Sequence, residues 1–261
     1  MSSSATDDLR ACRAEGPADF TTVIFDLDGT LVDSSGDIHA ALRVALQEVA
    51  DGRHSHDADE AELRLGAHGL ALDGFYRRVR PRGSEAGMRA FVAAYRQHYH
   101  SHLLDTTHPF PGVVEGLTRL AQLRARTRHP DGTPRLRLAV ATTKLTATAR
   151  RMVTELGLGE FFDWVQGSDG LRVKPDPQVL HVTLAALGRD AGESAATRDP
   201  LRGLMVGDTE FDILAGRAAG MRTCAVAWSE IPRARLLDAQ PDHFAETFTH
   251  VVELVITAHR A

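Results

Sequence analysis

The fold is decided by the stretch VIFDLDGTLVD, residues 23–33. Its β-branched and aromatic beginning, residues 22–25, is typical of a short buried strand that runs into a turn. Side chains alternate along a strand, so Asp26 and Asp28 are expected to point the same way, and Gly29 lets the backbone bend after them. Two carboxylates this close repel by roughly 4 kcal/mol at an effective dielectric constant near 20. The stretch therefore indicates either a plain strand and Asx-Gly turn, or a site where a cation or a reaction compensates the repulsion.

Composition limits the classes of function. The 261 residues suit one core domain with a smaller insertion, and 43% apolar with 25% charged residues is ordinary for a globular protein. The net charge of −5 gives no reason to expect nucleic acid or an anionic membrane as the main partner. Only Cys12 and Cys224 are available, so a disulfide framework is not expected and a reducing cytoplasm is the predicted location. No apolar run reaches membrane-spanning length, and the thirteen histidines show no ligand spacing.

Strand and helix patterns alternate along the second half of the chain. Strands are predicted at 136–141, 161–166, 203–206 and 223–227, and helices at 113–123, 146–156 and 179–187, the last ending at Gly188. Such alternation predicts an α/β fold with a doubly wound parallel sheet. The polar loops at 126–134 and 189–202 are expected to be surface decoration.

Residues 36–104 have a different character. Apolar residues recur at helical spacing from 36 to 50, and residues 58–104 continue as helical pieces without a convincing strand. The sequence therefore predicts a disordered tail at 1–19, an inserted all-helical domain at 35–104, and a core domain formed by 20–34 with 105–261.

Polar residues follow three of the predicted strands where each strand ends. They are Asp26 and Asp28, Thr142 and Thr143, and Asp208 with Asp212, and Lys174-Pro175 lies between the last two groups. Sites in open α/β sheets form at the carboxyl ends of the strands, so these residues are expected to meet.

These four groups, in this order and spacing, resemble the motifs of the haloacid dehalogenase superfamily, and within it the phosphoglycolate-phosphatase-like group. The motifs are DLDGTLVDS (26–34), LAVATTK (138–144), KP (174–175) and GDTEFD (207–212), and the resemblance covers about residues 22–245. It implies a Rossmann-like core, with the helical insertion closing over the site as a cap.

The residues themselves suit phosphoryl transfer. Asp26 is placed to take the phosphoryl group as an aspartyl phosphate, and Asp28 to protonate the leaving oxygen and later deprotonate water. Four carboxylates contribute −4 and Lys174 returns only +1, so a dianionic substrate requires a divalent cation. Oxygen ligands and a phosphate substrate favour Mg²⁺.

The resemblance assigns further roles. It implies that Asp26, the backbone carbonyl of Asp28 and Asp208 hold Mg²⁺ with Asp212 nearby, although Asp212 also fits a helix cap. It implies that the Thr142 hydroxyl holds a phosphoryl oxygen and that Lys174 balances charge. Thr143 is the competing hydroxyl, and Gly29, Thr143 and His68 are candidates for substrate contacts.

The predicted function is a Mg²⁺-dependent phosphatase for a small phosphorylated metabolite, such as 2-phosphoglycolate. The alternative is a sugar-phosphate mutase of the β-phosphoglucomutase type, although the segment 66–70 lacks the lysine of that group's cap loop. A catalytically silent binding protein is a third interpretation, but none of the motif residues is lost. Dehalogenases lack the second aspartate, so the presence of Asp28 disfavours that chemistry.

The sequence leaves the substrate and the oligomeric state, monomer or homodimer, undecided. His68 is predicted either to reach a substrate group or to face solvent. The four arginines between 77 and 82 fit either a second anionic group on the substrate or a solvated helix face, and the second is favoured because four neighbours cannot all point into one cleft.

Overall fold

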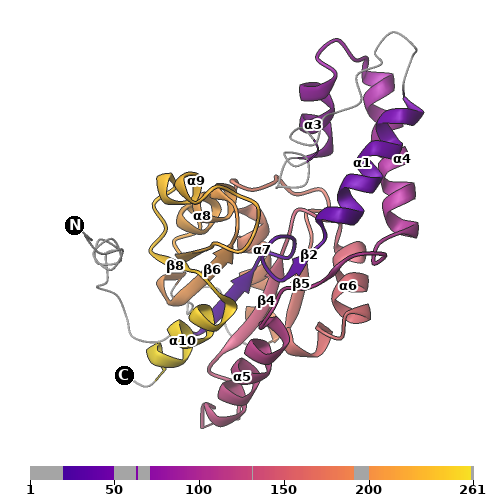
Figure 1. The fold of residues 1–261 in the computed structure, drawn as a ribbon. Helices are drawn as coiled ribbons and strands as arrows, with labels where there is room; N and C mark the ends of the chain where they lie inside the picture. The colour runs from indigo at the N-terminus through magenta and orange to yellow at the C-terminus, as the bar shows by residue number, and fades with distance from the viewer. Residues whose placement is uncertain (1–19, 50–62, 64–70, 131, 191–199, 260–261) are drawn as a thin grey trace, which may run out of the picture.

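Six parallel strands form the central sheet of the protein (Figure 1). The computed structural model describes residues 20–49, 63, 71–130, 132–190 and 200–259. Every neighbouring pair of strands in this sheet runs parallel, and β1 lies between β4 and β6. Across the sheet the strands are, in spatial order, β5 (Trp164–Gln166), β4 (Arg137–Ala141), β1 (Thr22–Phe25), β6 (Gly203–Gly207), β7 (Arg222–Val226) and β8 (His243–Ala245).

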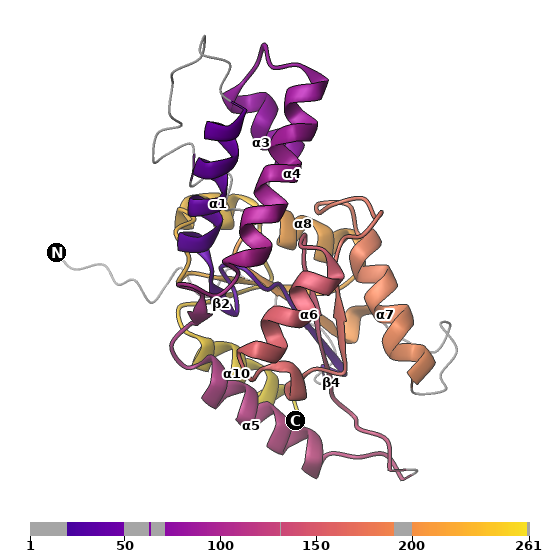
Figure 2. The ribbon, with the colours of Figure 1, turned by 90° about the vertical axis from the view of Figure 1, so that its right-hand side faces the viewer.

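Helices cover both faces of the sheet (Figure 2). Phe25 and Val140 point to one face and share a core with α5, α6 and α10, whereas Ile24 and Ala139 point to the other face and pack with α7 and α8. This alternation confirms the predicted doubly wound α/β fold. The helices are α5 (Val113–Arg126), α6 (Thr146–Glu155) and α10 (Phe248–Ala258) on the first face, and α7 (Gln178–Asp190), α8 (Glu210–Ala218) and α9 (Arg233–Asp238) on the second.

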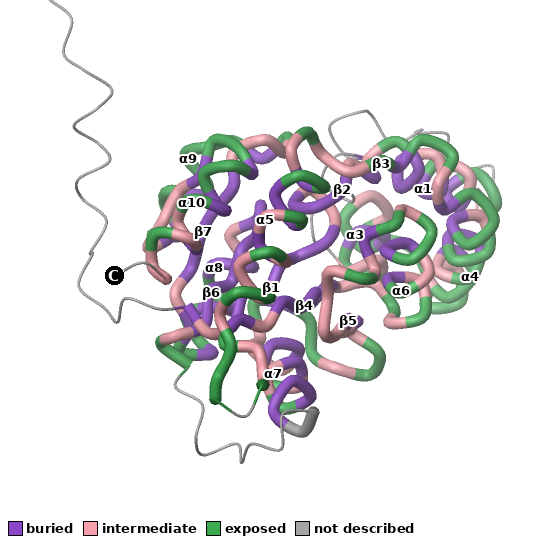
Figure 3. Tube along the Cα trace, turned by 90° about the horizontal axis from the view of Figure 1, so that it is seen from below, coloured by how far each residue is buried: buried purple, intermediate pink, exposed green. Residues whose placement is uncertain are grey.

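The central strand β1 is fully buried. All four of its residues are buried, and the Phe25 ring stacks on Phe248 of α10 at 5.8 Å between ring centres. Figure 3 shows the strands as buried segments inside a more exposed shell. A strand covered on both faces needs a continuous apolar run rather than alternation, which explains the sequence that opens the motif.

Three helices inserted after β1 stand together to one side of the sheet (Figure 1). They are α1 (Ser35–Glu48), α3 (Leu72–Val79) and α4 (Glu85–Ser101), and α1 packs along α4. The predicted apolar positions of α1 are buried, and the rings of Phe75, Tyr76 and Phe91 pack with centres 5.3–5.9 Å apart. The insertion is therefore helical in all its described elements, as predicted.

A two-stranded ribbon connects this helical insertion to the sheet. It pairs β2 (Val32–Asp33) with β3 (His108–Pro109) in antiparallel fashion, and the sequence analysis did not predict it. Beside it, the buried carboxylate of Asp37 accepts hydrogen bonds from the backbone and hydroxyl groups of Thr106 and Thr107, at 2.6–3.0 Å. We call these hydrogen bonds between Asp37, Thr106 and Thr107 the Asp37 clamp. The predicted boundaries at 34/35 and 104/105 lie next to this clamp, and the division into two domains stays a prediction.

Three expectations about elements need correction. Helix α7 does not end at Gly188 but continues to Asp190, because a glycine costs a helix only about 1 kcal/mol and the buried Leu187 keeps packing. The predicted strand at 161–166 is shorter, because a 3-10 turn at Gly159–Phe161 precedes β5. The edge strand β8 was not predicted at all.

Other expectations concern the ends and loops. The tail at 1–19 and most of the loop at 189–202 lie outside the described residues. The described part of the loop at 126–134 is largely exposed, as expected for surface decoration. Cys224 is buried and forms no disulfide among the described residues. Among the described helices, none combines the length and apolar composition needed to cross a bilayer.

Candidate active site

The predicted site residues from three strands meet at one edge of the sheet. Asp26 follows β1, Thr142 follows β4, and Asp208 follows β6, and these are the three central, adjacent strands. Because the strands are parallel, their carboxyl ends lie at the same edge, so residues 66 to 182 positions apart in sequence become neighbours. The sequence prediction that these groups converge is therefore confirmed for their positions, while their chemical roles stay predictions.

Lys174 is the buried cation at the centre of this edge. Its ammonium donates to Asp26 Oδ1, to Asp212 Oδ1 and to the carbonyl oxygen of Ala141, each at 2.7 Å, so all three of its donors are used. Burial alone would lower the pKa of Lys174, but Asp212 and Asp26 more than offset this and hold that pKa above its ordinary value. Lys174 thus stays charged between two carboxylates.

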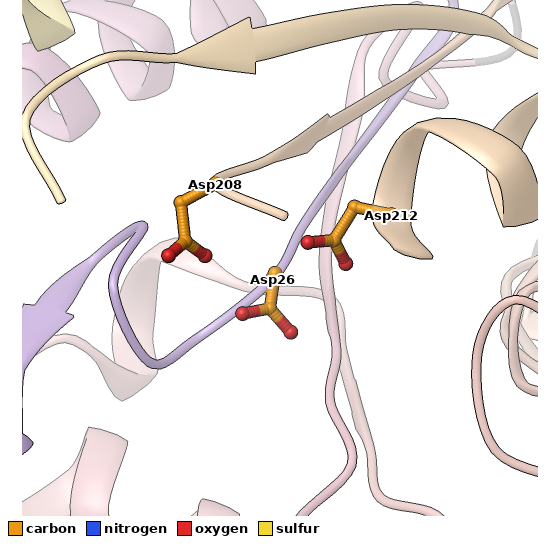
Figure 4. Close-up of side chains that lie close together, drawn as sticks. All are labelled: Asp26, Asp208 and Asp212. Carbon is orange, nitrogen blue, oxygen red and sulfur yellow. The ribbon is translucent and has the colours of Figure 1, made fainter. Parts of the chain in front are cut away.

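Three buried carboxylates form a cluster that fits a divalent cation. Asp26, Asp208 and Asp212 each offer an oxygen, and these oxygens lie within 4.8 Å of one another (Figure 4). Asp208 Oδ2 is buried and has no hydrogen-bond partner among the described residues. A buried carboxylate oxygen without a donor is costly, and an all-oxygen set suits Mg²⁺. Within the described chain, no other group of three His, Cys, Asp or Glu side chains has this geometry.

The charges of the cluster support the same fit. Burial raises the pKa of Asp26 to about 7, against the attraction of Lys174 and with added repulsion from Asp212 and Asp28. Burial also raises the pKa of Asp208 well above its ordinary value, and repulsion from Asp26 and Asp212 adds to this. A divalent cation at the cluster would favour the ionised carboxylates, and so would oppose both the effect of burial and their mutual repulsion.

Gly29 makes room for the cluster. Its backbone is left-handed, with φ of +77°, and a Cβ at this position would lie 2.1 Å from Asp208 Oδ2. Both the backbone conformation and the close approach require glycine. This steric role is an addition to the predicted substrate contact of Gly29, which stays a prediction.

Asp212 caps a helix and also faces the carboxylate cluster. Its Oδ2 accepts hydrogen bonds from the backbone and hydroxyl of Thr209, at 3.1 and 2.6 Å, in a capping box at the start of α8. Its Oδ1 accepts from Lys174. The helix cap therefore fixes the carboxylate that faces the cluster, and a role of Asp212 beside a metal ion stays a prediction.

Asp28 lies beside the cluster with two partners that the sequence analysis did not assign. Its Oδ1 accepts a hydrogen bond from the Ser34 hydroxyl and lies 2.8 Å from Lys144 Nζ. The Lys144 ammonium also lies 4.6 Å from the centre of the Tyr99 ring on α4. Lys144 and Lys174 are the only two lysines in the sequence, and all other basic residues apart from histidine are arginines. The rarity of lysine in the sequence is the signal that could have marked Lys144 as a candidate site residue.

Thr142 and Thr143, which follow β4, differ in burial and in their position relative to the cavity. Thr142 is buried, with 1% of its surface exposed, and its Oγ1 accepts a hydrogen bond from the backbone nitrogen of Lys144 at 3.2 Å. Thr143 is half-buried and lines a cavity of about 870 Å³ that also contains Asp26, Asp28 and Lys174. Which hydroxyl contacts a phosphoryl oxygen therefore stays open between the two.

The remaining candidates lie elsewhere. His68 and the segment 66–70, on which the mutase comparison depends, are outside the described residues. The arginines at 77–82 do not line the cavity, and Arg77 instead forms an exposed ion pair with Glu85 at 2.6 Å. This agrees with the interpretation of that segment as a solvated helix face.

Comparison with known proteins agrees with the geometry. Residues 23–226 match the family of haloacid dehalogenase-like hydrolases. The chain is 30% identical over 239 residues to pyrophosphatase PpaX of Halalkalibacterium halodurans, covering 91% of this chain and 97% of the relative. It is 29% identical over 239 residues to a phosphoglycolate phosphatase of Aquifex aeolicus, covering 88% and 98%.

A solved structure has the same overall arrangement. A haloacid dehalogenase-like family protein from Streptococcus pneumoniae superimposes with a TM-score of 0.71 at 28% identity, over 89% of this chain and 97% of that one. The protein belongs to the haloacid dehalogenase-like hydrolase family.

Proposed function

We propose that this protein is a Mg²⁺-dependent phosphatase that hydrolyses small phosphorylated metabolites through an aspartyl phosphate on Asp26. The observation that carries the proposal is the contact of Asp26 with the buried Lys174 beside the Asp208–Asp212 pair, at the floor of a cavity. A nucleophilic carboxylate must remain ionised and fixed, and Lys174 favours both. Asp26, Asp208 and Asp212 would hold the Mg²⁺, which supplies charge neutralisation for an incoming phosphoryl group.

The first half-reaction transfers the phosphoryl group to the protein. A carboxylate oxygen of Asp26 attacks phosphorus, and the bond between phosphorus and the leaving oxygen breaks. Asp28 donates a proton to that oxygen, so the leaving group departs as a neutral alcohol. Lys174 offsets the negative charge of Asp26 before the attack, and the Thr142 or Thr143 hydroxyl is proposed to donate to a phosphoryl oxygen.

The second half-reaction regenerates the enzyme. Asp28, now ionised, takes a proton from water, and the water oxygen attacks phosphorus. The acyl phosphate bond breaks, Asp26 recovers its carboxylate and inorganic phosphate leaves. Lys144 keeps Asp28 near this position through the contact at 2.8 Å. The same residue thus acts first as acid and then as base.

The names of the relatives suggest substrates but do not choose among them. A pyrophosphatase and a phosphoglycolate phosphatase are similar to this chain at 30% and 29% identity. 2-Phosphoglycolate and pyrophosphate are therefore both candidates under this proposal. The two cysteines in 261 residues support a cytoplasmic location, which fractionation of cells with an antibody to the protein tests.

The proposal is tested by phosphate release from acetyl phosphate and p-nitrophenyl phosphate, with and without added Mg²⁺. Removal of divalent cations with EDTA is expected to abolish turnover, and Asp26→Asn is expected to show none at any Mg²⁺ concentration. Asp238→Asn, a change on the exposed end of α9, is the matched control and should retain full activity. Full turnover by the Asp26→Asn protein would refute the proposal.

A further inference from the structure

The cavity above the carboxylate cluster is much larger than a phosphoryl group. It measures about 870 Å³ and lies between the carboxyl edge of the sheet and the helices α1, α3 and α4. Ligand cavities of this size generally enclose most of a drug-sized molecule. A leaving group of two carbons would leave most of this volume unfilled by substrate.

The wall contributed by the inserted helices includes a set of apolar and aromatic side chains, beside the polar residues Asp73, Arg96, Gln97, His100 and Ser101. Ile38 and Tyr99 are buried and Leu72, Met88 and Val92 are half-buried, and all of them line the cavity. Tyr95 stacks on Tyr99 with ring centres 5.4 Å apart and adds a second aromatic face. An apolar wall of this kind gains free energy by contact with a hydrocarbon surface and none by contact with a second anionic group.

The sheet side continues this surface at the cavity edge. Leu145 and Val173 line the cavity and keep 37% and 38% of their surface exposed. They flank the candidate catalytic loops that carry Lys144 and Lys174. Large apolar side chains exposed at a reaction site are typical of a surface that is covered when ligand binds.

The cations of the cavity are already engaged. Lys174 is bound by Asp26 and Asp212, and Lys144 is paired with Asp28. Arg96 also lines the cavity but is exposed, so water and salt screen its charge. Among the described residues of the cavity wall, none therefore offers a buried, uncompensated cation for the carboxylate of 2-phosphoglycolate or the second phosphoryl group of pyrophosphate.

We propose that the substrate of this protein is a phosphate monoester whose leaving group has an extended apolar or aromatic body, held against the wall formed by Leu72, Met88, Val92 and the Tyr95–Tyr99 pair. This inference rests on the proposed phosphatase function and specifies its substrate class. The phosphate lies at Asp26, and the apolar body extends from the cluster toward α3 and α4.

The experiment compares a series of n-alkyl phosphates from methyl to hexyl, with kcat/KM measured at saturating Mg²⁺. The leaving alcohols are similarly basic, so chain length changes the apolar contact and little else. We expect kcat/KM to rise about threefold for each added methylene, because each buried methylene strengthens transition-state binding. 2-Phosphoglycolate and pyrophosphate should fall at least tenfold below hexyl phosphate. A flat or falling series overturns the inference.

Met88→Gln tests the wall itself. It keeps the side-chain length and helix propensity of methionine but places an amide in the cavity, and it should reduce the rise in kcat/KM for each added methylene. Leu237→Gln, on the exposed face of α9, is the matched control and should keep the full chain-length dependence. An unchanged dependence in Met88→Gln contradicts the assigned wall.

Hydrolysis of acetyl phosphate tests the phosphatase function separately from the apolar substrate class. Its leaving group is small, so its hydrolysis needs no apolar contact. If the protein hydrolyses acetyl phosphate and the alkyl series is flat, the phosphatase function stands and the apolar specificity is wrong. If no ester and no acetyl phosphate is hydrolysed with Mg²⁺, both are wrong.

Discussion

Lys144 and Asp28 form a half-buried ion pair, with Nζ 2.8 Å from Oδ1, at the mouth of the candidate active site. The Tyr99 ring of the inserted helix α4 lies against the same ammonium, 4.6 Å from its centre. Lys144 after β4 thus contacts both Asp28 after β1, the proposed acid and base, and Tyr99 of the insertion. The helical insertion therefore contacts Lys144, the partner of the proposed acid and base, and also lines the cavity.

Lys144→Met is expected to lower kcat about tenfold, because Asp28 loses the cation that fixes its carboxylate near the leaving oxygen. KM for a small ester should change less than threefold, since Lys144 is already paired and does not receive the phosphate. Lys144→Arg should restore part of kcat. Steady-state kinetics with p-nitrophenyl phosphate provides the measurement, and an unchanged kcat in Lys144→Met would show that the pair has no part in the reaction.

Gly29→Ala is expected to abolish Mg²⁺ binding, because its Cβ would lie 2.1 Å from Asp208 Oδ2 and displace that carboxylate. Gly157→Ala is the matched control, since Gly157 has a similar φ of +69° but no atom within 4 Å of the added Cβ. Both changes strain a left-handed backbone, and only the first enters the cluster. Calorimetric titration with Mg²⁺ measures the difference. Equal Mg²⁺ affinity in the two variants would contradict the close approach as the cause.

Lys174→Met removes the cation from between two buried carboxylates. We expect it to lower the free energy of unfolding by about 3 kcal/mol in EDTA, because Asp26 and Asp212 are left facing each other without compensation. Added Mg²⁺ should raise the Tm of this variant more than that of the wild type, since the metal then replaces the lost charge.

The control for that change is Arg119→Met, which breaks the exposed pair between Arg119 and Glu253. Exposed pairs contribute at most about 1 kcal/mol, so this variant should unfold nearly as the wild type does. Denaturant titration and thermal unfolding with EDTA or Mg²⁺ give both quantities. A Lys174→Met protein with wild-type stability and no added response to Mg²⁺ would mean that the buried charges are compensated in another way.

Asp37→Ala removes the clamp between α1 and the segment that returns to the sheet. It leaves the backbone and hydroxyl donors of Thr106 and Thr107 without their acceptor, and we expect the free energy of unfolding to fall by about 3 kcal/mol. Asp105→Ala, which breaks only an exposed contact with His102, should change it by less than about 0.5 kcal/mol. If urea titration gave similar free energies of unfolding for the two variants, the Asp37 hydrogen bonds would not have the proposed stabilising role.

The sequence predicted the sheet because buried parallel strands appear as short apolar runs separated by helical periodicity. It also predicted that Asp26, Lys174 and Asp208 meet, because the carboxyl ends of parallel strands share one edge. Strand β8 was missed because it has three residues at the edge of the sheet and only one of them is fully buried. Strand β8 forms because its backbone pairs with β7, and the residue pattern of β8 itself gives no sign of this pairing.

The contact of Tyr99 with Lys144 was beyond sequence reasoning for a different reason. Tyr99 belongs to an inserted helix, and helical periodicity shows which face of α4 is apolar but not where that helix lies relative to the sheet. Its contact with Lys144 depends on how the ribbon β2–β3 and the Asp37 clamp orient the insertion. The apolar wall of the cavity depends on the same orientation, so the proposed substrate class follows from the structure alone.

The central claim is that Asp26 carries the phosphoryl group during turnover, and chemical trapping tests it most directly. The protein is mixed with substrate and Mg²⁺, quenched in acid within one turnover, and reduced with borohydride, which converts an aspartyl phosphate to homoserine. Peptide mass spectrometry is expected to find homoserine at position 26, dependent on both substrate and Mg²⁺. Homoserine at another aspartate, or none at any position while phosphate is released, would contradict the account.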